Sequence, residues 1–106
     1  MAEKSRKQKL MEMLAEDPND AFLRYGLAME FVSEGNDEEA VRQLQDLVQT
    51  CPDYVPGYQQ AGQAFLRLGR LREAREMFTR GIEVARAQGE RHAMEEMQGF
   101  LDSLPD

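Results

Sequence analysis

The sequence predicts an all-α protein of antiparallel helix hairpins stacked side by side, with about six helices in its 106 residues. The first observation is a repeat with a period of 34 residues. The second is apolar spacing of three and four residues, which is typical of a helix with one buried face. The third is the recurrence of Pro18 as Pro52 and of Gly35 as Gly69, between the apolar segments. Such a repeat indicates stacked helical units, none of which buries its apolar face alone.

The two copies of the repeat occupy residues 21–54 and 55–88. Residues matched between the copies are Phe31 and Phe65, Gly35 and Gly69, Glu39 and Glu73, and Ala40 and Ala74. Pro18, just before the first copy, recurs as Pro52 near its end. Two positions have a small residue in both copies, namely Ala28 with Gly62 and Ala40 with Ala74. We expect the two helices of each hairpin to cross closely there, because a larger side chain would overpack the crossing.

The first helix is predicted from about Glu3 to Ala15, and it ends before the sequence Asp-Pro-Asn-Asp. Leu10 has the same spacing from Pro18 as Leu44 has from Pro52. The helix therefore corresponds to the second helix of a hairpin whose first helix is missing. Residues 3–17 are expected to be an N-terminal capping helix that protects the first full copy from water.

The two copies predict four helices, each pair divided by a glycine, Gly35 or Gly69, that permits a left-handed turn. Asp20 is the expected N-cap of the first helix of the first copy, and Asn36 or Asp37 starts its second helix. The expected ranges are about 21–34, 38–49, 56–68 and 71–88.

A last helix is predicted from about Arg91 to Ser103, in a shifted register. A shift of two residues gives a better apolar face than straight continuation of the repeat, with Met94, Met97, Gln98 and Leu101 in place of His92, Glu95, Glu96 and Gly99. Arg86 explains the shift, because it stands where the repeat has a proline and lets the preceding helix continue. Residues 90–104 are expected to be a C-terminal capping helix, with Phe100 and Leu104 closing the end.

The repeat resembles the tetratricopeptide repeat (TPR) over residues 21–88. That family's pattern has a large residue, then Leu-Gly, an aromatic residue, Ala-x-x-x-Phe and Pro. The first copy reads Arg24, Leu27, Ala28, Phe31, Ala40, Leu44 and Pro52, and the second reads Tyr58, Ala61, Gly62, Phe65, Ala74 and Phe78. Arg24 and Arg86 depart from the pattern, and Arg24 is expected to weaken one core contact. The resemblance implies a right-handed α-solenoid, with residues 1–106 as one domain, that acts as a non-catalytic protein-interaction scaffold.

Composition limits the classes of function. The net charge of −7 argues against binding nucleic acid, which needs a concentrated excess of cations. No apolar stretch is long enough for a membrane span, and no signal peptide is evident, so a cytoplasmic protein is expected. The charge is also unevenly distributed: the first nine residues are basic, the segment 12–53 is acidic, and the segment 67–91 is rich in arginine. These charges indicate either solvated helix faces or electrostatic steering of a charged partner, including head-to-tail self-association.

Catalytic and metal chemistry find little support in the sequence. Cys51 and His92 are the only residues of their types and lie in different segments, so neither a zinc site nor a Cys-His pair is expected. No glycine-rich phosphate loop is present, and no cofactor is expected. Cys51 is interpreted as a small apolar filler at a helix end, with a reactive thiol as the alternative. The chain is not expected to be an enzyme.

The resemblance implies a concave groove that binds a peptide or protein segment, lined by the first helix of each copy. The candidate groove residues are Phe22, Tyr25, Met29, Val32, Gln59, Gln63, Leu66, Arg67, His92 and Glu95. The groove would be apolar and aromatic at one end, lined by amides in the middle and charged at the other. Three occupants of the apolar end remain open: a foreign protein or peptide, the chain's own first helix, or a second copy in a homodimer.

Overall fold

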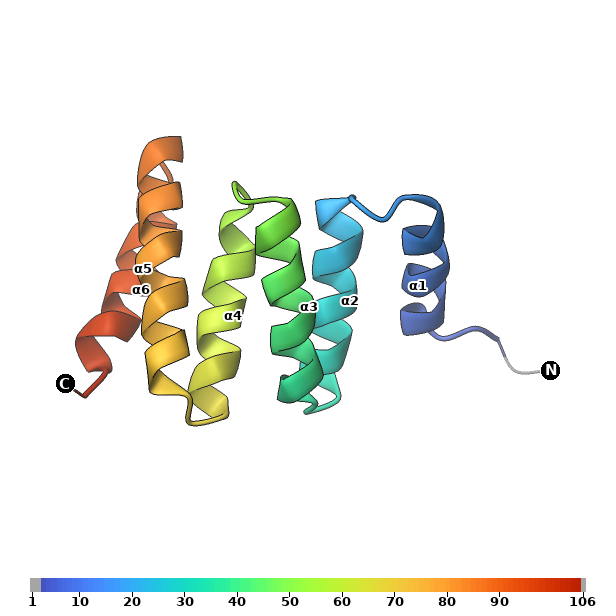
Figure 1. The fold of residues 1–106 in the computed structure, drawn as a ribbon, viewed down its shortest axis with the longest axis horizontal. Coiled ribbons are helices and arrows are strands. Elements are labelled where there is room, and N and C mark those ends of the chain that lie inside the picture. The colour runs from blue at the N-terminus through green and yellow to red at the C-terminus, as the bar shows by residue number, and fades with distance from the viewer. Residues whose placement is uncertain (1–2, 106) are drawn as a thin grey trace.

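The structure, a computed structural model, describes residues 3–105, and these residues form α-helices and no strand. The helices are α1 (Arg6–Glu16), α2 (Ala21–Ser33), α3 (Asp37–Thr50), α4 (Val55–Arg67), α5 (Leu71–Gln88) and α6 (Arg91–Ser103). They follow one another along an elongated molecule of 51 × 28 × 20 Å, with the two ends of the chain at opposite ends of the row (Figure 1). The all-α hairpin architecture predicted from the repeat is confirmed.

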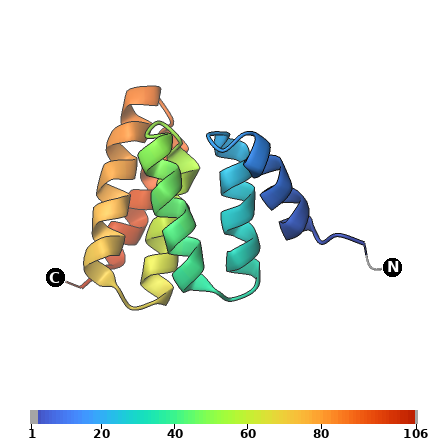
Figure 2. The ribbon, with the colours of Figure 1, turned by 45° about the vertical axis from the view of Figure 1, so that its right-hand side comes forward.

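Each helix packs mainly against its neighbours in sequence, and α4 also contacts α6. Figure 2 shows α4 and α6 behind α3 and α5, so the helices form two layers over the second half of the chain. A continuous apolar core runs between these layers, from Ala28 in α2 to Met97 in α6. Helix α1 lies at the outer edge and packs against α2 (Figure 2).

The helix boundaries follow local capping. Helix α1 begins at Arg6, later than predicted, because Ser5 and Gln8 form a capping box in which each side chain binds the backbone N–H of the other. Asp20 and Asn36 cap α2 and α3 through their side-chain oxygens, as expected. Helices α5 and α6 have the predicted bounds.

The positions predicted to be small do lie at close helix crossings. Ala28, Ala40 and Ala74 are completely buried. At Gly62 there is no room even for a methyl group, since a Cβ there would lie 2.4 Å from the ring of Phe78. The predicted overpacking is therefore confirmed at Gly62.

Arg24 does more than the prediction allowed. In the second copy, Tyr58 donates its hydroxyl proton to the carbonyl oxygen of Pro52 over 2.8 Å. Arg24 occupies the equivalent position 34 residues earlier, and its Nε donates to the carbonyl oxygen of Pro18. The expectation of a weakened contact missed this hydrogen bond, which a guanidinium can make as well as a phenol.

The shifted register of α6 is correct at three of its four predicted positions. Met97 is completely buried, and the space for its sulfur is provided by Gly81 of α5. Met94 and Leu101 are partly buried against the core. The prediction for Gln98 is wrong: its side chain is exposed and donates to Asp102, because no helix of residues 3–105 packs on that side of α6. Phe100 lies over the core instead, stacked on Phe78 with ring centroids 5.0 Å apart.

Candidate functional site

Helix α2 carries an apolar surface that the rest of the molecule does not bury. Its charged residues are Arg24 and Glu30, and most of its other side chains are apolar. Nevertheless only Leu27 and Ala28 of α2 are buried, whereas α4 buries seven residues, among them Tyr58 and Phe65. Apolar side chains on α2 thus remain partly accessible, including Met29 and Val32 of the candidate groove.

Tyr25 joins α2 to the beginning of α4. Its ring lies 5.5 Å from that of Tyr54, the residue before α4, at an interplanar angle of 59°. Burial raises the pKa of Tyr25, the neighbouring Tyr54 raises it further, and a side-chain hydrogen bond with Gln60 opposes the shift. Burial likewise raises the pKa of Tyr54, with a second contribution from the nearby carboxylate of Asp20. Both phenols are therefore neutral hydrogen-bonding groups at physiological pH.

The middle of the candidate groove is formed by α4. Gln59 and Gln63 lie one turn apart on this helix and are partly buried, as is Leu66. Arg67, expected at the groove edge, holds Asp37 of α3 through two nitrogens at 3.0–3.1 Å. Its guanidinium thus links the two repeats.

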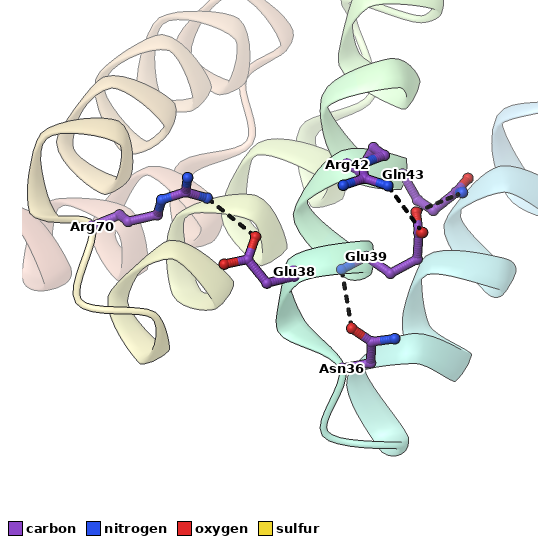
Figure 3. Close-up of polar contacts among 6 residues, drawn as sticks. All are labelled: Asn36, Glu38, Glu39, Arg42, Gln43 and Arg70. Atoms are coloured by element: carbon purple, nitrogen blue, oxygen red, sulfur yellow. Dashed lines mark hydrogen bonds and ion pairs between the residues drawn. The ribbon is translucent and has the colours of Figure 1, made fainter.

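More ion pairs cross the same end of the molecule. Arg70 lies 3.5 Å from Glu38, which projects from the first turn of α3 (Figure 3). In the same turn Asn36 caps the helix, and Glu39 contacts Arg42 and Gln43 (Figure 3). The acidic first turn of α3 is therefore partly neutralised by arginines of the second repeat, which favours an intramolecular role for this part of the uneven charge.

The two candidate residues on α6 are solvent-exposed. Glu95 pairs with Arg91 over 3.1 Å, and His92 lies 3.3 Å from Glu96, each pair one turn apart on α6. They lie on α6, the helix that contacts α4, which carries Gln59 and Gln63.

Helix α1 does not cover the aromatic end of α2. Leu10 packs on Gly26, Arg6 pairs with Glu30, and Lys7 pairs with Glu34. Phe22 remains 71% exposed, on the rim of a hollow between α1 and α2. The chain's own first helix is therefore not the cover for this residue.

Cys51 lies outside the candidate groove. The Cys51 thiol is partly buried and lies 3.6 Å from the carbonyl oxygen of Asn19, a packing position at the helix end. Among residues 3–105, no three His, Cys, Asp or Glu side chains converge as a metal ion would require. In the same part of the chain, no helix combines the length and apolarity needed to cross a membrane.

Comparison with known proteins decides the family. The family model of the tetratricopeptide repeat matches residues 1–106. The chain belongs to the tetratricopeptide repeat family. A TPR repeat-containing protein of Pseudomonas aeruginosa is 35% identical over 95 residues, which are 90% of each chain. TPR proteins are in general non-catalytic modules of protein–protein interaction, and this chain has their fold.

Solved structures show the same TPR architecture. A tetratricopeptide repeat domain protein from Salinibacter ruber is 39% identical, with a TM-score of 0.71 over 76% of this chain and 89% of that one. PcrH, solved in complex with the chaperone binding region of PopD, has a TM-score of 0.86 over 92% of this chain and 74% of its own, at 20% identity. Protein BPP2914 from Bordetella parapertussis has a TM-score of 0.80 at 22% identity, covering 94% of this chain and 87% of its own. These last two show likeness of fold alone.

One residue of this TPR surface escaped the sequence analysis. Tyr54 lies outside the family's core positions and was not predicted to take part. The sequence feature that could have indicated it is an aromatic residue directly before α4. In the structure its ring contacts Tyr25 of α2. The contact depends on how the two hairpins stack, which spacing along one helix does not reveal.

Proposed function

We propose that the surface of α2, α4 and α6 binds a segment of another protein, with the apolar side chains of α2 as its anchor. The observation that carries this proposal is that α2 is the most weakly buried helix of a full repeat despite its apolar composition. Exposed apolar surface of this kind marks interaction sites on soluble proteins. The fold supports it, since PcrH, a structural neighbour, was solved with a segment of PopD.

The chemistry of the groove fits a peptide with an apolar residue at one end. Met29 and Val32 offer adaptable apolar contacts, and the unbranched Met side chain fills irregular gaps. The amides of Gln59 and Gln63 can each donate to and accept from a peptide backbone. His92 and Glu95 then contact the polar end of the bound segment.

The test uses Met29→Lys with Val32→Lys, which places two charges on the anchor. Tyr25 is left intact, because its contact with Tyr54 supports the packing of the repeats. We expect partners captured by the wild-type protein to be lost, because an apolar partner side chain would have to contact two ammonium groups. The matched control is Thr79→Lys on the exposed face of α5, which should keep the same partners.

Two further measurements check that the variant is folded and that the partner lies at the anchor. Circular dichroism must show an unchanged helix content, and a photoreactive amino acid at position 29 should crosslink the partner where the same group at position 79 does not. The proposal fails if the double variant captures the same partners, or if sedimentation shows that the wild-type protein is a dimer that the double variant dissociates. The second result would assign the surface to a homodimer.

A further inference from the structure

Compared with the 34-residue repeat, one helix position beside α1 is vacant within residues 3–105. Shifting by one repeat places α1 on α3 and α2 on α4. Helix α3 lies between two neighbours, α2 and α4. Helix α1 has α2 in the place of α4, but no described helix takes the place that α2 has against α3.

The side chains around this vacancy form a hollow. It is lined by Arg6, Lys9, Leu10, Met13, Phe22 and Leu23. Met13 is 46% exposed, whereas its equivalent Leu47 is completely buried in the intact hairpin. Leu47 lies against Gly57 of α4, and Leu23 of α2 stands in the place of Gly57. The hollow therefore lies where α1 packs on α2 more openly than α3 packs on α4.

The charges around the hollow define what it accepts. Its two charged lining residues, Arg6 and Lys9, are both cationic, and they stand where the intact hairpin has the uncharged Ala40 and Gln43. Within residues 3–105 no carboxylate forms a salt bridge with Lys9, and Arg6 is 71% exposed despite its contact with Glu30. An occupant needs an apolar face for Met13 and Phe22, and carboxylates for the two cations.

A second copy of this chain does not meet these requirements well. The last described helix is α6, where Gln98 stands at the position that Ala28 and Gly62 keep small. Opposite it, Arg6 stands at the position of Ala40. Two long polar side chains would meet where an intact hairpin brings two small residues together, and this prevents the close crossing.

We propose that the hollow between α1 and α2 binds an acidic amphipathic helix of a different protein, which lies against both helices. Its apolar face covers Leu10, Met13, Phe22 and Leu23, and its carboxylates pair with Arg6 and Lys9. This is a helix-in-groove mode of recognition. The site adjoins the groove of α2, α4 and α6 and shares Phe22 with its candidate residues, so the test uses residues that belong to only one of the two.

The probes are two stapled helical peptides of 16 residues with the same leucine and alanine face. One carries glutamates beside that face, and the other carries lysines in the same places. In protein labelled with 13C at the methionine methyl groups, Met13 reports on the hollow, Met29 on the groove and Met94 on α6. We expect the glutamate peptide to shift the Met13 signal and leave Met29 unchanged.

Affinity then separates charge from apolar contact. We expect the lysine peptide to bind about tenfold more weakly or worse, because two exposed ion pairs are lost and replaced by repulsion. Met13→Glu should abolish binding of the glutamate peptide. The matched control Met11→Glu should retain it, because Met11 is 52% exposed on the same helix and does not line the hollow.

Several outcomes overturn the proposal. They are equal affinity for the two peptides, a shift of Met29 without Met13, or no response of Met13 to either peptide. A joint shift of Met13 and Met94 on raising the protein concentration without peptide would also overturn it, since that assigns the hollow to a second copy.

Discussion

At the scale of single residues, the two repeats reach the same helix crossing with side chains of compensating size. The second repeat has Gly62 against the ring of Phe78, and the equivalent residues of the first repeat are Ala28 and Leu44. The larger ring of Phe78 takes the volume that a methyl group at position 62 would need. In an interior packed this densely, adding or removing one methyl group changes the stability of the protein.

This compensation predicts a context-dependent substitution. We expect Gly62→Ala to lower the free energy of unfolding by about 2 kcal/mol, because overpacking against Phe78 exceeds the gain in helix propensity. In a Phe78→Leu background the same Gly62→Ala change should be neutral or stabilising, since alanine and leucine are the pair of the first repeat. Urea unfolding of the four proteins measures the difference, and equal effects in both backgrounds would contradict the size argument.

The small positions could be predicted from the residue types alone, but the hydrogen bond of Arg24 could not. The crossing positions could be predicted because only small residues fit there, whatever their neighbours. The hydrogen bond from Arg24 to Pro18 depends on the reach of a long side chain to a backbone carbonyl. The family pattern gives the usual residue at each position. It does not show which other residues can make the same contact.

At the scale of helices, the end of α5 determines where α6 lies. With Arg86 in place of a proline, α5 continues to Gln88 and ends at Gly89, whose φ of 71° is left-handed. The register shift could be predicted from the sequence for this reason. The exposure of Gln98 could not, because it depends on which side of α6 another helix covers.

The contact between Arg67 and Asp37 is the strongest link between repeats among the ion pairs of α3. Its geometry is bidentate, and the Asp37 side chain is only 15% exposed. We expect a double-mutant cycle with Arg67→Ala and Asp37→Ala to give a coupling free energy of about 1 kcal/mol, reduced in 1 M salt. The longer, more exposed pair of Arg70 and Glu38 is the internal comparison and should give less than half of that. A larger coupling for Arg70 and Glu38 would contradict the assignment.

At the scale of the whole molecule, stability is distributed along a row of helices. The main contacts join neighbours, and the helix at each end has fewer of them than the helices between. Repeat proteins of this kind are stabilised by each unit and by its interfaces with the next. Helix α1, which buries only Leu10, is the least secured element.

Hydrogen exchange should therefore reveal a gradient. We expect the amides of α1 to exchange about tenfold or more faster than those of α4, because α1 can detach from α2 without opening the core. Leu10→Ala should speed exchange in α1 further while leaving α4 unchanged. Protection of α1 equal to that of α4 would show that the molecule opens as a single unit.

At this scale, the sequence could predict one part of the candidate site and not another. The repeat predicted which helix faces point toward the groove, because face and spacing are properties of one helix. It did not predict that Tyr25 is engaged with Tyr54, that Arg67 is held by Asp37, or that Phe22 borders a hollow beside α1. These facts depend on the stacking of hairpins, to which distant parts of the sequence contribute.

The row of neighbouring contacts also governs how the molecule responds to force. In a protein whose first and last elements pack together, a pulling force must break many interactions at once. Here the two chain ends lie at opposite ends of the row (Figure 1). Tension applied to them would peel α1 and α6 away first, each from its own neighbour. The chain would then lengthen in successive small steps as the inner helices follow.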